Sequence, residues 1–345
     1  MKSRTATALV LVAIAASAQA SDDGTPAPPP PLAGPLHRLL TDVRARIDAS
    51  ILARPPKLVP PKKLAIKWKL GKVGSIDLGG SLVALTAADL DGDRKAELYA
   101  VTPRDVVAIA IHGRRLEEIG RASFTGEPAI PASRDVVGTA IVDDGAVIAS
   151  SSGWARSLRV TWTKKGLVAT AGAGGFALCP GTVVQLLPGR NYFADPAVPA
   201  VARYGARCRD GLVEPDGHPL RVRGDLSIAN KLGIVIDRCA AAGLGCSSIS
   251  AAEYSNVGIA FEIADVDRDG RPEVIFAGAG APGDPDTLKV VTIGDDEKKT
   301  KLKKAFTAGG IAGITSADLD GDGDEEVVAA VRIAGASRID LWRIE

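Results

Sequence analysis

Aromatic residues and net charge are both scarce in this sequence. Six phenylalanines, four tyrosines and four tryptophans make up 4% of the 345 residues, and the formal net charge is +1. A surface that binds nucleic acid needs a basic field for the phosphates or aromatic side chains on which bases stack. We therefore expect no nucleic-acid partner. The shortage of aromatics also argues mildly against a sugar-stacking surface.

Signatures of catalysis are missing as well. The sequence has no Gly-x-Ser-x-Gly elbow, no His-Glu-x-x-His motif and no phosphate-binding glycine loop. Its histidines, His37, His112 and His218, are scattered, and no Cys-x-x-Cys pair exists, so a zinc site is poorly supported. No catalytic residue and no organic cofactor site is predicted, although acids from separate strands can converge without leaving a local motif.

An apolar stretch near the N-terminus is the candidate targeting segment. Lys2 and Arg4 precede an apolar stretch at 6–16, and small residues at 18–20 form a cleavage site. This order is typical of a secretory signal peptide, and the stretch is too short to span a membrane. We predict a signal peptide over 1–20, export, and no transmembrane segment after its removal. The predicted location is secreted or cell-surface, with the periplasm as an alternative.

Cysteine is limited to four residues, which can pair in three ways. An exported protein meets an oxidising environment, which favours disulfides over free thiols. We predict Cys239–Cys246 as a local disulfide and Cys179–Cys208 as the longer one.

Proline and glycine are abundant, with 22 and 38 residues. Residues 21–63 form a Pro-rich linker that contains one short amphipathic helix at 36–53. We expect this helix to pack on the following domain, and docking on a partner is the alternative. From 64 to 345, short apolar runs separated by Gly, Asp and Pro predict short strands and an all-β domain.

Three stretches of this domain share one spacing of acidic residues. Acids stand at relative positions 1, 3, 5 and 9, and position 7 offers a carbonyl, which wraps a loop around one hard cation. The predicted metal ligands are Asp89, Asp91, Asp93, Lys95 and Glu97 in the first loop, Asp265, Asp267, Asp269, Arg271 and Glu273 in the second, and Asp318, Asp320, Asp322, Asp324 and Glu326 in the third. Two to three calcium ions are the predicted cofactor.

The residue at position 12 excludes the EF-hand, another calcium loop that begins with the Asp-x-Asp-x-Asp pattern. An EF-hand has a glutamate there between two helices, but the sequence has Ala100, Phe276 and Ala329 in strand-like runs. With the acid at position 9 instead, the loops resemble the FG-GAP or VCBS-type repeat of integrin-α-like propellers, of the exported bacterial type. That family usually has aspartate at position 9, where this chain has glutamate. It also has glycine at position 6, where the first loop has Arg94.

The resemblance implies a β-propeller with structural calcium ions. The loop starts at Asp265 and Asp318 lie 53 residues apart, a period typical of a blade. Steps of this size from Asp89 place degenerate copies near 143 and near 195. Five copies predict five blades, with six or seven as alternatives.

Two further features of the ring are predicted. The long interval after 195 indicates a disulfide-stapled insertion at about 179–246 in the third unit. The alternating run 64–70 is expected to complete the last blade, because a ring without an open sheet edge avoids aggregation.

Charge distinguishes the three loops. Four carboxylates per loop repel one another without a cation. Arg94 and Lys95 are expected to offset this in the first loop, and Arg268 and Arg271 in the second. The third loop has no base, so we expect it to bind calcium most tightly. A separate basic cluster at 298–304 is interpreted as a solvated hairpin.

The leading hypothesis is a non-enzymatic binding, adhesion or scaffold module. It would act as a monomer on an unknown protein or glycan ligand. The alternative is a propeller-fold hydrolase or lyase acting on an extracellular polysaccharide, because propellers also host chemistry in their central channel.

Overall fold

The chain divides into two compact units, Met1–Arg54 and Pro55–Glu345. The predicted signal peptide lies outside the residues that the structure describes. Of the predicted helix at 36–53, Leu39 and Val43 are described, and both are helical and exposed. No helix among the described residues is long and apolar enough to cross a membrane. The computed structural model describes residues 39, 43, 62–128, 136–186, 193–195, 198–227, 229–239, 245–280, 283–333 and 336–345.

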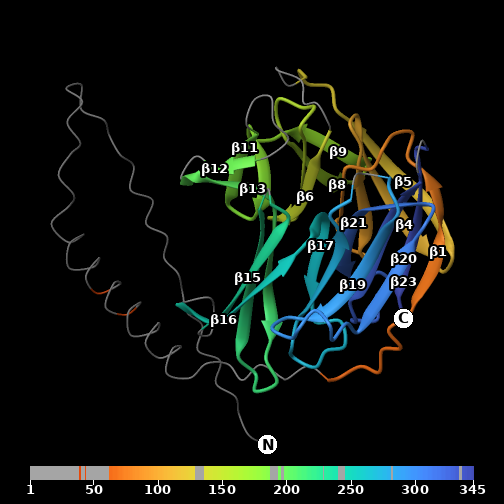
Figure 1. Cartoon of the computed structure of the whole chain (residues 1–345). Coiled ribbons are helices and arrows are strands. Elements are labelled where there is room, and N and C mark those ends of the chain that lie inside the picture. The colour runs from red at the N-terminus through yellow and green to blue at the C-terminus, as the bar shows by residue number, and fades with distance from the viewer. Residues whose placement is uncertain are drawn as a thin grey trace, which may run out of the picture. The chain divides into compact units, whose positions relative to one another are not determined.

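The described part of Pro55–Glu345 forms five antiparallel sheets (Figure 1). The first sheet consists of β2 (Ala84–Ala88), β3 (Glu97–Val101), β4 (Asp105–His112) and β5 (Arg115–Ser123). The second consists of β6 (Gly138–Asp143), β7 (Ala146–Ser151), β8 (Leu158–Thr163) and β9 (Gly166–Ala171). The fourth consists of β17 (Val257–Ala264), β18 (Glu273–Gly278), β19 (Asp286–Thr292) and β20 (Leu302–Phe306).

The other two sheets are less regular. The third consists of β10 (Phe176–Cys179), β11 (Thr182–Leu186), β12 (Phe193–Asp195), β13 (Val198–Val213), β14 (Pro219–Ser227), β15 (Lys231–Cys239) and β16 (Cys246–Ser255). The fifth consists of β21 (Gly309–Ala317), β22 (Glu326–Ile333), β23 (Arg338–Ile344) and β1 (Leu70–Asp77).

The sheets are the blades of a propeller. The innermost strand β21 lies beside β2 on one side and β17 on the other, β2 also lies beside β6, and β6 beside β10. The ring is completed by β13, which lies beside both β10 and β17. The predicted all-β propeller of five blades is confirmed.

The core lies between neighbouring blades. Ile275 of the fourth blade and Ile314 of the fifth belong to one buried cluster, and Tyr99 of the first and Val147 of the second belong to another. All four side chains are fully buried. Burial of each large aliphatic side chain contributes roughly 1.5–3 kcal/mol, so the blades stabilise one another.

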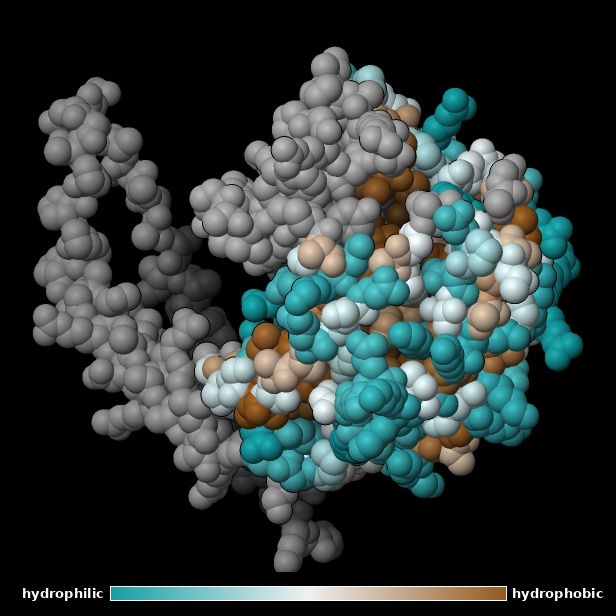
Figure 2. Space-filling view, viewed as in Figure 1, coloured by the Kyte–Doolittle hydropathy of each residue, from teal (hydrophilic) through white to brown (hydrophobic). Residues whose placement is uncertain are grey.

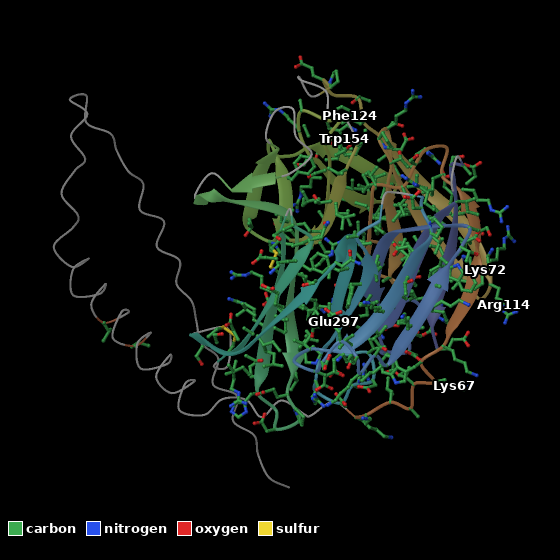
Figure 3. The ribbon with its side chains drawn as sticks, viewed as in Figure 1. Lys67, Lys72, Arg114, Phe124, Trp154 and Glu297 are labelled. Carbon is green, nitrogen blue, oxygen red and sulfur yellow. A yellow bond between two sulfur atoms is a disulfide. The ribbon has the colours of Figure 1, made fainter. Side chains whose placement is uncertain are left out.

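The first and second blades are also joined by an aromatic stack (Figure 3). Phe124 follows β5, and its ring lies 4.9 Å from that of Trp154, which follows β7. The indole N–H of Trp154 donates to the carbonyl of Pro103, 2.7 Å away, so the polar end of this buried side chain is satisfied. Hydrophilic side chains cover much of the described surface seen in Figure 2, with hydrophobic ones in small areas among them.

An N-terminal strand closes the ring, as predicted, but it begins later than expected. The strand β1 pairs with β23 in an antiparallel register from Leu70↔Ile344 to Asp77↔Arg338 (Figure 1). The predicted strand was 64–70. Trp68 has a left-handed backbone with φ of 52°, which interrupts an extended strand there.

Only one of the two degenerate copies predicted near 143 and 195 forms the inner hairpin of a blade. Residue 143 ends β6, and Asp144 and Gly145 make a two-residue hairpin turn with positive φ into β7, so this copy is the inner hairpin of the second blade. The copy near 195 is wrong. Residues 193–195 form β12, which pairs with β11 and β13 rather than facing the axis, because extra strands precede β13 in this blade.

Both predicted disulfides are present, and both lie in the seven-stranded third blade. Cys179 of β10 bonds to Cys208 of β13, and Cys239 of β15 bonds to Cys246 of β16. The longer disulfide ties the extra strand β10 to the middle of the sheet. No free cysteine is present.

Candidate metal centre

The three acidic loops occupy the same place in three consecutive blades. They connect the innermost strand to the next one, as β2–β3 in the first blade, β17–β18 in the fourth and β21–β22 in the fifth. The glutamates at position 9 begin the second strand each time, as the sequence predicts; they are Glu97, Glu273 and Glu326.

The loops are linked to one another around the ring. The backbone N–H of Ala96 in the first loop donates to the carbonyl of Asp318 in the third, 2.7 Å away. The guanidinium of Arg268 in the second loop lies 2.6 Å from Asp324 in the third and also donates to the carbonyl of Gly323. The three loops therefore form one continuous acidic surface at the same end of the propeller.

Carboxylates converge in the first loop because backbone N–H groups hold them there. Asp89 accepts from Gly92 at 2.7 Å with one oxygen and from Arg94 at 3.0 Å with the other. The first loop thus holds three carboxylate oxygens within 4.8 Å of one another, one each from Asp89, Asp91 and Glu97. Arg94 has a φ of 74°, so this position has the backbone that glycine adopts in the other two loops.

The third loop repeats this geometry. Asp318 accepts from Gly321 at 2.7 Å and from Gly323 at 2.9 Å, one bond to each oxygen. Its carboxylate, with those of Asp320 and Glu326, forms the same three-oxygen group. Asp93 and Asp322, at position 5, lie outside these groups and instead accept from the N–H of position 7.

The second loop has a lysine inside its acidic cluster. The ammonium of Lys301 lies 2.6 Å from Glu273 and 3.0 Å from Asp267, and both carboxylates are almost fully buried. Here the group within 4.8 Å consists of Asp265, Asp267 and Asp269. The Lys301 ammonium is thus paired with the position 9 glutamate. In the described part of the chain no ion pair is made by Glu97 or Glu326, although Arg343 is near enough to Glu326 to lower the pKa of its carboxyl.

Sequence reasoning assigned the wrong bases to the second loop. Arg268 reaches the third loop, and Arg271 lies 3.3 Å from Asp295 instead of the loop's own acids. The charge of the second loop is offset by Lys301 and by Lys63, which lies 3.2 Å from Asp269. The basic cluster at 298–304 is therefore more than a solvated hairpin, because Lys301 points into the site.

The third loop also has basic neighbours that its own sequence does not contain. Arg268 pairs with Asp324, and Arg209 of β13 pairs with Glu325. Both arginines come from other blades, so periodicity along the chain could not place them. The carboxylates of Asp318, Asp320 and Glu326 remain clustered and are not the ones that these arginines pair with.

The glutamates at position 9 share an unusual environment. Burial raises the pKa of Glu97, Glu273 and Glu326 to about 7 each, with a neighbouring aspartate adding to the effect. Each accepts a hydrogen bond from the backbone N–H at position 2, which in the second and third loops belongs to Val266 and Leu319. Glu97 and Glu273 are buried and Glu326 is half-buried, so their ionised carboxylates favour a positive partner.

The donor chemistry fits a hard divalent cation. All side-chain ligands in the three groups are carboxylate oxygens, which calcium and magnesium prefer. The distances between the oxygens allow one ion to contact several of them. A fourth group, Glu214, Asp216 and His218, lies in the β13–β14 loop and was not predicted. Arg238 forms a bidentate pair with Glu214 there, at 2.6 and 2.9 Å.

Comparison with known proteins agrees with this arrangement. Residues 265–329 match the FG-GAP-like repeat, and this span contains the second and third acidic loops. The chain is a five-bladed β-propeller that contains an FG-GAP-like repeat. No curated protein matches this chain.

Two solved structures are similar to it at low identity. One is a triple arginine-to-alanine mutant of AofleA from Arthrobotrys oligospora, with 13% identity and a TM-score of 0.30 over 75% of this chain and 68% of that one. The other is the PQQ-bound aldose sugar dehydrogenase of Streptomyces coelicolor, with 12% identity and a TM-score of 0.38 over 81% of this chain and 99% of that one.

Proposed function

We propose that this FG-GAP propeller is an exported calcium-binding module that binds a partner without catalysing a reaction. One observation carries the calcium part of the proposal. The same hairpin in three consecutive blades holds a cluster of carboxylates whose oxygens lie within 4.8 Å of one another. Such clusters repel without a cation, and oxygen-only donors suit calcium.

Calcium would have a structural role here. The loops are joined across blades by the Ala96–Asp318 hydrogen bond and the Arg268–Asp324 ion pair. An ion in each loop would therefore stiffen a surface shared by the fifth, first and fourth blades. Calcium modules of exported proteins bind at about 10⁻⁴ to 10⁻³ M, which matches an extracellular supply of the ion.

Export and partner binding complete the proposal. Two disulfides support an oxidising location. A ring of packed blades whose last blade is completed by β1 is suited to presenting loops to a protein or glycan, and we expect it to act as a monomer in adhesion or as a scaffold.

The calcium proposal is tested by thermal unfolding of residues 21–345 in excess calcium and in chelator, with elemental analysis of bound metal. We expect a large rise in Tm with calcium, mostly removed by Asp318→Ala with Asp320→Ala. The matched control is Glu117→Ala with Asp284→Ala, which removes two exposed acids outside the loops. Equal Tm values with no bound metal would reject calcium.

The partner proposal needs a separate test. Pull-down from an extract and a degradation screen on polysaccharides should be run on the same sample. Saturable binding of an unchanged protein or glycan supports a binding module. Turnover of a polysaccharide would overturn it in favour of a hydrolase or lyase.

A further inference from the structure

The propeller has a cavity on its axis that is separate from the acidic loops. Its volume is about 240 Å³, and the innermost strands of all five blades contribute to its wall. The wall includes Thr86 of β2, Ala140 of β6, Leu178 of β10, Arg207 of β13, Glu262 of β17 and Ser316 of β21. A water takes up about 30 Å³ in the liquid, so the cavity has room for a small molecule.

Two arginines on one strand supply the positive charges in the wall of this cavity. Arg207 and Arg209 are two residues apart on β13, so they face the same side of the sheet, and both line the cavity. Arg209 is paired with Glu325. Asp210, another lining residue, accepts from Arg221 at 2.8 Å, so its charge is also offset.

Arg207 is held more loosely than Arg209. Its Nε lies 3.9 Å from Glu262, beyond hydrogen-bond distance, and one of its other nitrogens donates to the carbonyl of Ala206 at 3.3 Å. Glu262 uses its other oxygen to accept from the N–H of Ile263 at 2.9 Å. A guanidinium has five N–H donors, so Arg207 retains hydrogen-bonding capacity toward the cavity.

Formal charge in the wall is balanced, because Glu262 and Asp210 match the two arginines in number. The side chain of Glu262 is mostly buried, and burial raises the pKa of its carboxyl, while Arg207 and Arg209 act in the opposite direction. The case for a bound anion therefore rests on the unused donors of Arg207 and not on a net positive charge.

Ser316 provides an independent sign of a missing partner. Its side chain is 5% exposed, and its hydroxyl has no hydrogen-bond partner among the residues that the structure describes. It lines the same cavity, with Thr86 and Thr315 close along the wall. A buried hydroxyl without a partner costs about 1–3 kcal/mol, which a bound polar molecule would recover.

We propose that the axial cavity binds a small oxyanion, held by the guanidinium of Arg207 and the hydroxyl of Ser316. Arginine presents its donors in a planar fork that matches the oxygens of a carboxylate or sulfate. The site draws on the innermost strands of all five blades, including the second and third, which carry none of the three acidic loops.

The test uses sodium sulfate and sodium glucuronate as probes, with glucose as the neutral match and all samples at one ionic strength. Calorimetric titration of the calcium-saturated protein should show binding of at least one anion and none of glucose. Arg207→Gln should weaken that binding at least tenfold, and Ser316→Ala several-fold. Arg115→Gln, which removes an equally charged but exposed side chain outside the cavity, should leave it unchanged.

Each result has a clear meaning. Sulfate and glucuronate binding equally well identifies the oxyanion alone as the recognised group, while stronger glucuronate binding identifies a hydroxylated carboxylate. Should Arg207→Gln fail to fold, Ser316→Ala still tests the site, because it keeps every charge. Binding of neither anion, or anion binding that neither substitution weakens, would overturn the proposal.

Discussion

Arg268 and Asp324 lie on different blades, yet their charged groups are 2.6 Å apart, which ties the second acidic loop to the third. The arginine also donates to the carbonyl of Gly323. The acidic loops are thus linked in the ring even though each is built from its own stretch of sequence. A change in one loop should be felt in the next.

A double-mutant cycle on Arg268→Gln and Asp324→Asn measures this link. We expect a coupling energy of about 0.5–1 kcal/mol in chelator, a modest value because both side chains are about one-third exposed. Urea unfolding of the four proteins gives the energy. The control cycle uses Arg115 and Glu117, which are 3.8 Å apart and more exposed, and should give a coupling near zero. A coupling energy near zero for Arg268 and Asp324 would mean that this pair does not link the two loops.

The second loop should respond to calcium through Lys301. Lys301→Met leaves Asp267 and Glu273 buried without their ammonium partner, so unfolding in chelator should become easier by about 3 kcal/mol. In excess calcium much of this loss should be recovered, because the ion can take the position of the ammonium. Calorimetry should also show tighter calcium binding by the variant.

The control for that experiment is Lys303→Met, an exposed lysine two residues further along, on β20. It should change neither stability nor calcium affinity. A Lys301 variant destabilised to the same extent in calcium and in chelator would show that the lysine is a permanent part of the core and does not compete with the ion.

The pH dependence of stability should reveal the buried glutamates. Glu97 has its pKa raised from the usual value of 4.5 to about 7 by burial, so the folded state holds a proton that the unfolded state releases. This contribution is fully present below pH 4.5 and is lost as pH rises through 7. In chelator, the stability of the native protein relative to Glu97→Gln should therefore fall by about 2–3 kcal/mol between pH 4.5 and pH 8.

Calcium should reverse that trend. The ion binds the ionised carboxylate, so the rise in Tm that it produces should grow from pH 5 to pH 7.5. Chemical unfolding at several pH values, with and without calcium, checks both parts. A difference between native and Glu97→Gln proteins that stays constant with pH would contradict the raised pKa.

Removal of the closing strand should abolish the fold. Deletion of residues 64–78 removes β1 and leaves the outer edge of β23 unpaired, so the variant should lose its cooperative thermal transition and aggregate. Circular dichroism on heating measures this. The control is a deletion of residues 2–61, which spares β1 and should keep the transition. Cooperative melting after the loss of β1 would show that the ring does not need closure.

Local patterns in the sequence predicted the features that are built locally. The acid spacing located all three hairpin loops, with Glu97, Glu273 and Glu326 at the expected strand starts. Both disulfides were assigned correctly. The closing segment was found, but its strand begins near its predicted end, because the positive φ of Trp68 cannot be deduced from an alternating pattern.

Contacts between residues far apart in the sequence, within a blade or between blades, were not predictable in the same way. Lys301 is 28 residues from Glu273 along the chain, and Arg209 is far from Glu325 in sequence. Neither sequence separation is typical of a contact within a helix or a hairpin. Both contacts arise from the folding of the sheets and the arrangement of the blades in the ring. One feature of the sequence distinguishes Lys301 from the rest of the basic cluster. Thr300 separates it from Lys299, and Leu302, which starts β20, follows it directly.

Because β1 pairs with β23, the last blade cannot form until the segment that contains β23 has been synthesised. A growing chain that has not yet reached Arg338 cannot form the last blade. Until then the edge of β1 that pairs with β23 lacks its partner, although the sequence of the other four blades has already been synthesised. Any chain shortened at its end would keep that edge and become a target for proteolysis or aggregation. Completion of the last blade therefore requires both strands, although β1 and β23 lie far apart in the sequence.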